Sequence, residues 1–169
     1  MKFLAALLLF AACAWALPAR AQDQIARGKY LAILGDCAGC HSAAHKPSFS
    51  GGMPFTASFG TLYSTNITPD KATGIGNWTA DQFYRALHNG IAPGGKHLYP
   101  AFPYIYFRRF GRQDTDALFS FLHTLKPVHR KPTPNRLSAS PVAYGLVPIP
   151  IANQAKSVAI KAPAPAPAR

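Results

Sequence analysis

Residues 37–41 read Cys-Ala-Gly-Cys-His, and this short stretch decides the fold of the chain. The spacing Cys-x-x-Cys-His is the attachment signature of a c-type haem. Two thiols three positions apart can form thioethers with the two vinyl groups on one edge of a porphyrin, and the imidazole that follows can bind the iron. The motif predicts one covalent haem c held by Cys37 and Cys40, with His41 as the proximal ligand of the iron.

Two other interpretations of a Cys-x-x-Cys pair fit this chain less well. A structural zinc site needs a second pair of ligands, and the only other cysteine, Cys13, lies near the amino terminus in an apolar run. A thioredoxin-like dithiol follows a buried strand in a βαβ unit, whereas residues 28–34 have the pattern of a helix. Haem attachment is therefore the favoured interpretation.

The first 21 residues have the pattern of a signal peptide. Lys2 precedes an apolar run over residues 3–17, and residues 19–21 form an Ala-x-Ala cleavage site. A membrane-spanning helix needs roughly 20 apolar residues, so an anchor is the weaker alternative. A lipidation signal at Cys13 is also disfavoured, because Phe10 occupies a position that usually holds Leu. We expect export to the periplasm and a mature chain that begins at Gln22.

The rest of the chain divides into a predicted domain and a predicted tail. Residues 22–130 are expected to form one haem domain, because apolar periodicity and aromatic residues persist over that range. Residues 131–169 are rich in Pro and Ala, which predicts a segment that wraps over the domain and then a disordered tail.

Three segments within the domain have helical periodicity. Residues 23–34 place Ala26, Tyr30, Ile33 and Leu34 on one face, and Gly28 beside them would permit a close crossing with another helix. Residues 80–89 follow a capping box that starts at Thr79 and end at Gly90. Residues 114–125 repeat apolar positions at i, i+3, i+4 and i+7, namely Leu118, Phe121, Leu122 and Leu125.

Between these segments lie long stretches, 42–78 and 91–112, that are dense in Gly, Pro, Ser and aromatic residues. Loops of this length are unusual in a compact domain unless they cover something. A haem would supply the apolar surface on which they pack. The sequence thus predicts an all-α fold with about three main helices and long haem-wrapping loops.

The charge of the chain is strongly positive. Without the signal peptide it has 16 basic residues against 6 acidic ones, all Asp, for a net charge of +10. Such a charge favours an acidic partner surface or an anionic surface such as a membrane. Nucleic acid is disfavoured, since the basic residues are scattered and the chain is expected to be exported.

A run of successive motifs resembles one haem domain of bacterial cytochrome c subunits. These subunits serve periplasmic dehydrogenases of the alcohol and gluconate type and some molybdenum hydroxylases. The resemblance covers about residues 25–130, and it rests on the stretches 28–32, 35–41, 51–55, 59–70, 73–78, 83–87, 96–100 and 125–129.

The resemblance implies a class I cytochrome c fold, in which an amino-terminal helix crosses a carboxy-terminal one and a distal loop covers the second face of the haem. It implies electron transfer from a periplasmic dehydrogenase towards the respiratory chain. It also shows two departures. The relatives usually join three haem domains and end in a membrane-binding segment, whereas this sequence has one Cys-x-x-Cys-His and a Pro/Ala-rich end.

The second departure lies in the distal loop, which in the family reads Tyr-Pro-Ala-Met-Pro-Tyr with Met as the sixth iron ligand. Here that position is Phe102, and a phenyl ring cannot bind iron. Met53 and His97 are the alternative sixth ligands, although apolar packing is the better explanation of Met53 and the resemblance implies that the family has His97 even where Met binds. We expect a weak or vacant distal site beneath Phe102.

Two functions remain open at this point. An electron carrier needs no acid/base pair or nucleophile, and none is evident beyond the haem motif. A vacant distal site would instead permit a small-ligand-binding or peroxidatic haem protein. The family resemblance favours the carrier. The chain is therefore expected to be a non-catalytic electron-transfer protein, or the electron-transfer subunit of a dehydrogenase, more than an enzyme in itself.

Overall fold

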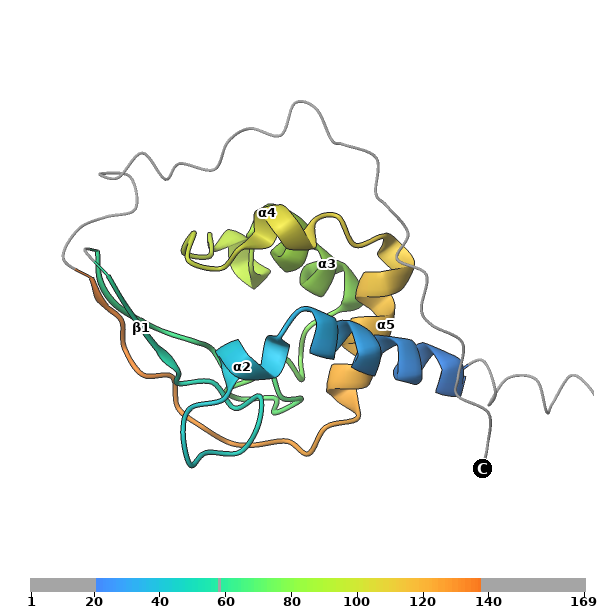
Figure 1. The fold of residues 1–169 in the computed structure, drawn as a ribbon, viewed down its shortest axis with the longest axis horizontal. Coiled ribbons are helices and arrows are strands. Elements are labelled where there is room, and N and C mark those ends of the chain that lie inside the picture. Colours follow the sequence, from blue (N-terminus) through green and yellow to red (C-terminus); the bar gives the residue numbers. More distant parts are fainter. Residues whose placement is uncertain (1–20, 58, 138–169) are drawn as a thin grey trace, which may run out of the picture.

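The structure, a computed structural model, describes residues 21–57 and 59–137 (Figure 1). Residues 1–20 of the predicted signal peptide (1–21) and residues 138–169 of the predicted wrapping segment and tail (131–169) lie outside the described residues. Within the described ranges, no helix combines the length and the apolar content needed to cross a bilayer.

The three segments with helical periodicity are helical in the structure. The first helix covers residues 21–34, α3 covers Ala80–Asn89 and α5 covers Arg112–His123. The capping box at the start of α3 is formed, since Thr79 accepts from the backbone of Gln82 and the Gln82 side chain bonds back to Thr79. Gly90 ends α3 in the left-handed conformation, as its position predicted.

Outside these three helices the structure contains shorter elements. They are two short helices, α2 (Cys37–His41) and α4 (Tyr104–Phe107), a 3₁₀ helix, η1 (Pro93–Gly95), and a small antiparallel sheet of order β1-β2-β3 that the all-α prediction did not include. The strands are β1 (Pro54–Ala57), β2 (Gly60–Tyr63) and β3 (Arg136–Leu137), and β1 pairs Phe55 with Leu62. Four-residue strands are too short for periodicity to reveal, so the fold is helical with a small sheet.

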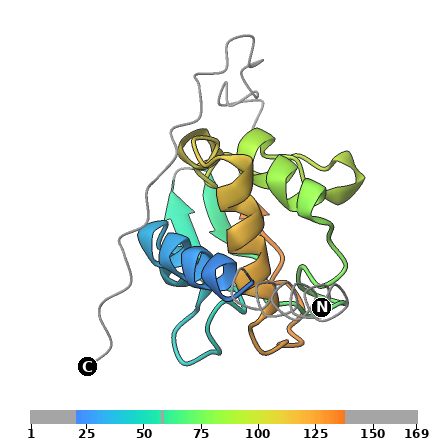
Figure 2. The same cartoon turned by 90° about the vertical axis from the view of Figure 1, so that its right-hand side faces the viewer.

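The first helix crosses α5 at Gly28 (Figure 2). A Cβ on Gly28 would overlap the backbone carbonyl of Ala117 and lie 2.7 Å from the Cβ of Phe121, so only glycine allows this approach. Beside the crossing, Arg27 Nε donates to Asp114 Oδ1 at 2.6 Å, and the Asp114 side chain is 4% exposed. The predicted crossing at Gly28 is therefore present, and a partly buried ion pair adjoins it.

The buried face of the first helix differs from the predicted one. Leu31 and Ala32 are buried with Gly28, whereas Ile33 and Leu34 are 70% and 53% exposed. The physical reason is the crossing itself, because residues at i+3 and i+4 from Gly28 share its face of the helix. The prediction that Ile33 and Leu34 face the core was wrong.

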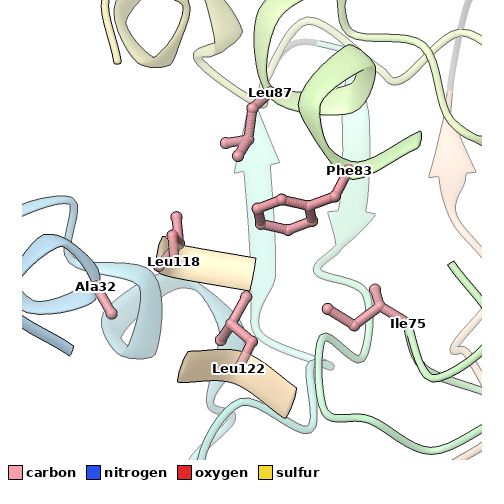
Figure 3. Close-up of a cluster of buried hydrophobic side chains, with 6 residues drawn as sticks. All are labelled: Ala32, Ile75, Phe83, Leu87, Leu118 and Leu122. Atoms are coloured by element: carbon pink, nitrogen blue, oxygen red, sulfur yellow. The ribbon is translucent and has the colours of Figure 1, made fainter. Parts of the chain in front are cut away.

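The core lies where the three longer helices meet. Figure 3 shows side chains from the first helix, α3 and α5 pointing towards one another, with one contributed by the loop before α3. The buried cluster consists of Ala32, Ile75, Phe83, Leu87, Leu118 and Leu122. This apolar centre holds α3 and α5 in fixed positions around the segments that carry the sequence motifs.

The segment after α5 is bonded back to the loop that precedes α3. Asn66, 8% exposed, donates from Nδ2 to the Val128 carbonyl at 2.7 Å and to Thr73 Oγ1 at 3.0 Å. Its Oδ1 accepts from the backbone and the hydroxyl of Thr68. One buried amide therefore joins the carboxy-terminal segment to residues 66–73.

Replacement of Gly28 tests the helix crossing. Helix propensity alone would make Gly28→Ala stabilising by about 1 kcal/mol. Because the methyl group would overlap the Ala117 carbonyl, we expect instead a loss of about 2 kcal/mol in the free energy of unfolding. Denaturant unfolding followed by circular dichroism measures it. Lys29→Ala, an exposed change on the same helix, is the control and should change stability by less than about 0.5 kcal/mol. Stabilisation by Gly28→Ala would contradict the close crossing.

Replacement of Asn66 tests the connection of the carboxy-terminal segment. Asn66→Ala removes four hydrogen bonds and leaves the Thr68 N–H and the Val128 carbonyl without their partner, so we expect a loss of about 3 kcal/mol in the same unfolding experiment. Asn77→Ala is the matched control, since Asn77 is exposed and its amide makes one bond, to the Lys71 carbonyl at 2.8 Å. Equal effects of the two substitutions would show that the Asn66 network adds nothing.

Candidate functional site

The two cysteines lie on the single turn of α2. Cys37 begins the helix and Cys40 follows at i+3, so their side chains project from the same side, and both thiols are free. The residue before the helix, Asp36, is in the left-handed conformation at φ 47°, and its carboxylate occupies the space that a Cβ on Gly39 would need. Glycine at position 39 thus lets the turn close beside Asp36.

Burial and nearby negative charge act on both thiols. Burial is the main cause that raises the pKa of Cys37 to about 11, followed by Cys40 and Asp36. Burial and Asp36 also raise the pKa of Cys40. At neutral pH both groups are therefore protonated thiols.

His41 closes α2, and one of its ring nitrogens is engaged. Its Nδ1 lies 2.7 Å from the Thr65 carbonyl oxygen. A carbonyl oxygen can only accept a hydrogen bond, so Nδ1 carries the proton and Nε2 keeps its lone pair. Burial lowers the pKa of His41, although the bond to Thr65 acts in the opposite direction, and the neutral imidazole is favoured. The imidazole is thus oriented by one nitrogen and able to bind a metal through the other.

The backbone around His41 is held by a glycine. Gly51 donates its N–H to the His41 carbonyl at 2.7 Å and has a φ of 74°. A Cβ at this position would overlap the backbone of Thr65. Gly51 therefore fits between the backbone of His41 and the backbone of Thr65, where a side chain would not fit.

Phe102 occupies the turn between its two flanking prolines and is half-buried. Its N–H donates to the Tyr99 carbonyl at 3.0 Å, and its carbonyl accepts from Tyr104 at 2.8 Å. The ring stacks on Phe107 of α4 with centroids 5.5 Å apart and planes 13° from parallel. Phe107 in turn packs against Gly35, whose own neighbour in space is the Cys37 sulfur. The structure thereby links the Phe102 loop to the beginning of α2 through one aromatic ring.

The two alternative distal residues lie in different settings. His97 is exposed, and its backbone pairs with Ile91 in an isolated bridge. Met53 is half-buried just before β1, where its backbone N–H donates to Ser64 Oγ at 2.9 Å. The structure brings Cys37, Cys40 and His41 together on one helix, and it leaves the His97 side chain on the surface.

The residues present fit a haem. Half-buried apolar side chains pack around the core beside Cys37, among them Phe49, Trp78, Phe102 and Phe107. Within the described ranges, the Tyr99 hydroxyl is buried and has no hydrogen-bond partner, although its ring packs on Phe59 with centroids 5.2 Å apart. A buried donor needs an acceptor, and a porphyrin carries carboxylates that can supply one. Two thiols for covalent attachment, an oriented imidazole for the iron and apolar rings for packing are what a c-type haem site requires.

The residues that orient His41 could not be identified from the sequence motif. Thr65 acts through its backbone carbonyl, which no residue type reveals. Gly51 had a visible signal, the Gly-Gly pair at 51–52, since adjacent glycines indicate positive φ or a close backbone approach. Arg130, which bonds the Gly51 carbonyl, lies 79 positions further along the chain and gave no signal.

Residues 25–126 match the family model described as Cytochrome c. The gluconate 2-dehydrogenase cytochrome c subunit of Pantoea cypripedii is 47% identical over 105 residues, which are 62% of this chain and 24% of that protein. The alcohol dehydrogenase (quinone) cytochrome c subunit of Gluconobacter oxydans is 44% identical over 130 residues, or 75% of this chain and 27% of that protein.

A third relative is the fructose dehydrogenase cytochrome subunit of Gluconobacter japonicus. It is 45% identical over 109 residues, which cover 63% of this chain and 22% of that protein. The chain thus spans between 22% and 27% of the length of these three relatives. The match over residues 25–126 contains α2, the Phe102 loop, α3, α5 and the first helix from residue 25 on. The chain belongs to the cytochrome c family, whose members bind haem c covalently and transfer electrons.

Proposed function

We propose that this chain is a class I cytochrome c that carries single electrons through one haem c. Cys37 and Cys40 form its thioethers, and Nε2 of His41 binds the iron. The observation that carries the proposal is the hydrogen bond from His41 Nδ1 to the Thr65 carbonyl, because it leaves Nε2 as the metal-binding nitrogen. The count of one haem is supported by the single Cys-x-x-Cys-His in the sequence.

Haem iron supplies a one-electron couple between Fe(III) and Fe(II). The chain contributes a fixed environment for that couple. Thr65 holds the imidazole of His41 in one orientation, and Phe102, Phe107 and Trp78 exclude water beside α2. Electron transfer requires little else from a protein, which supports a non-catalytic electron-transfer protein or subunit.

The donor in this proposal is a periplasmic dehydrogenase, and the acceptor belongs to the respiratory chain. Support for the donor comes from the printed names of the relatives, which are cytochrome subunits of gluconate, quinone-dependent alcohol and fructose dehydrogenases. Support for the periplasm comes from the signal-peptide pattern in residues 1–21.

An exposed apolar surface near α2 supports docking to such a partner. The end of the first helix meets α4 where Gly35 packs against the Phe107 ring. On these two elements Ile33, Leu34, Ile105 and Tyr106 are between 47% and 70% exposed. Arg108 and Arg109 follow directly and are exposed. We propose that this surface, called the α4 surface below, meets an acidic face of the donor.

The second candidate function is binding of a small ligand at an open distal position. The observation that favours it is Phe102 itself, which stacks on Phe107 at the position where the family resemblance implies a Met ligand. Loss of Met ligation should also lower the reduction potential. An electron carrier with a weak distal ligand accounts for the same residues, and it remains the main proposal.

Restoration of the methionine tests the distal site. We expect the reduced wild-type protein to bind carbon monoxide and the oxidised protein to lack the long-wavelength band of a Met–iron bond. Phe102→Met should create that band, raise the reduction potential and weaken carbon monoxide binding about tenfold or more, since 1.4 kcal/mol of competing bond energy is enough. Absorption spectra of both redox states and a carbon monoxide titration provide the measurement.

Two substitutions serve as controls for that experiment. Met53→Leu and His97→Ala should leave the wild-type spectra unchanged. A Met–iron band in the wild type that disappears in Met53→Leu would make Met53 the sixth ligand, and a spectrum that changes in His97→Ala would assign that role to His97.

Charge reversal tests the α4 surface. We expect the rate of reduction by a quinone-dependent alcohol dehydrogenase lacking its own cytochrome subunit to fall as salt is raised. At low ionic strength the double substitution Arg108→Glu with Arg109→Glu should slow reduction by about tenfold or more. Stopped-flow absorption spectroscopy follows the haem directly.

The matched control reverses two charges elsewhere. Lys126 and Lys131 are exposed in the segment after α5, which lies on the opposite side of the molecule from α4 in both views (Figures 1 and 2). Lys126→Glu with Lys131→Glu should slow reduction much less. Equal slowing by both pairs would show that net charge alone guides the encounter and that the α4 surface is not the docking site.

A further inference from the structure

The segment that follows α5 places Arg130 beside Gly51, the residue that bonds the His41 carbonyl. Its backbone N–H donates to Thr73 Oγ1 at 3.0 Å, and the N–H of Val128 donates to Thr68 Oγ1 at 3.1 Å. The Val128 carbonyl accepts from the buried amide of Asn66. Three bonds to residues 66–73 thus fix the backbone on both sides of position 129, and the direction of the Arg130 side chain follows from them.

The guanidinium of Arg130 bonds the glycine pair at 51–52. Its Nη1 donates to the Gly51 carbonyl. A Cβ on Gly52 would overlap the guanidinium, and Gly52 has a φ of 82°, so the second glycine makes room for the arginine. Arg130 is half-buried in this position, where a hydrogen bond from a charged donor is stronger than on an exposed surface.

The same glycine pair contacts both partners of the His41 hydrogen bond. The N–H of Gly51 bonds the His41 carbonyl at 2.7 Å, and the N–H of Gly52 bonds the Ser64 carbonyl at 2.8 Å. Ser64 immediately precedes Thr65, whose carbonyl accepts the proton of His41 Nδ1 at 2.7 Å. A continuous hydrogen-bonded path therefore runs from the Arg130 guanidinium, through the Gly51–Gly52 peptide, to the residue next to the acceptor.

We infer that Arg130 is a positioning residue for the proximal ligand. By holding Gly51 and Gly52 against Ser64 and Thr65, it fixes the Thr65 carbonyl at bonding distance from His41 Nδ1 and thereby lowers the reduction potential. A strong bond from Nδ1–H makes the imidazole a better electron donor, which stabilises Fe(III) relative to Fe(II). This inference rests on the proposed function, since it takes His41 as the iron ligand.

The positive charge of Arg130 acts on the potential in the opposite direction. A nearby cation disfavours the more positive Fe(III) state, so removal of a cation by itself lowers the potential. Removal of the positioning bond should weaken the Nδ1–H bond and raise the potential. The sign of the change on removing Arg130 therefore separates the two roles.

The experiment compares Arg130→Ala, Arg130→Lys and Lys131→Ala in the haem-loaded protein. Lys131 is an exposed cation one residue away, so its removal reports the effect of charge. The readouts are the midpoint potential and the Fe–His stretching frequency, measured by resonance Raman on the ferrous form after photolysis of its carbon monoxide adduct. We expect Arg130→Ala to raise the potential and lower the Fe–His frequency. Arg130→Lys should shift both in the same direction by less, and Lys131→Ala should leave the frequency unchanged and the potential unchanged or lower.

An unchanged or lower potential in Arg130→Ala, with an unchanged Fe–His frequency, would overturn the positioning role. If Arg130→Ala does not accumulate, Arg130→Lys decides the question by the same signs. If the wild-type protein carries haem c with His41 bound, and the Arg130 variants change neither the potential nor the Fe–His frequency, only this inference is overturned. A wild-type protein without haem c would remove the proposed function as well.

Discussion

The hydrogen bond from His41 Nδ1 to the Thr65 carbonyl is the interaction on which the site depends. It connects α2 to a loop residue 24 positions later, and it leaves Nε2 as the nitrogen that can bind a metal. An imidazole without this bond could rotate and exchange tautomers. The backbone that presents Thr65 is therefore as much a part of the site as the Cys-x-x-Cys-His motif.

Much of the remaining structure can be understood as support for that bond. The core of α3, α5 and the first helix fixes the loop before α3 through Ile75. Asn66 joins this loop to the segment after α5, and that segment carries Arg130 to Gly51. Glycines at 28 and 51 allow two close backbone approaches, one between helices and one beside the ligand. The same residues thus stabilise the fold locally and fix the geometry of the site.

The sequence predicted the parts of this arrangement that depend on local patterns. Helical periodicity and the capping box located residues 80–89 correctly, and the Gly28 crossing was expected from a small residue on an apolar helix. The small sheet was missed because its strands have two to four residues, too few to show alternation. The exposure of Ile33 and Leu34 was missed because their burial depends on where α5 crosses, which is set by tertiary contacts. Thr65 acts through its backbone carbonyl, and the Arg130 guanidinium bonds a carbonyl 79 positions earlier in the chain, so no local pattern indicates either residue.

The central claim is that one haem is attached through both cysteines of α2. Mass spectrometry of proteolytic fragments from the protein produced with a haem-attachment system tests this claim most directly. The account predicts that the fragment containing Cys37 and Cys40 carries a single haem bound through both sulfurs, and that no other fragment carries one. Recovery of that fragment with free thiols, or with a disulfide in place of the two thioethers, would contradict it.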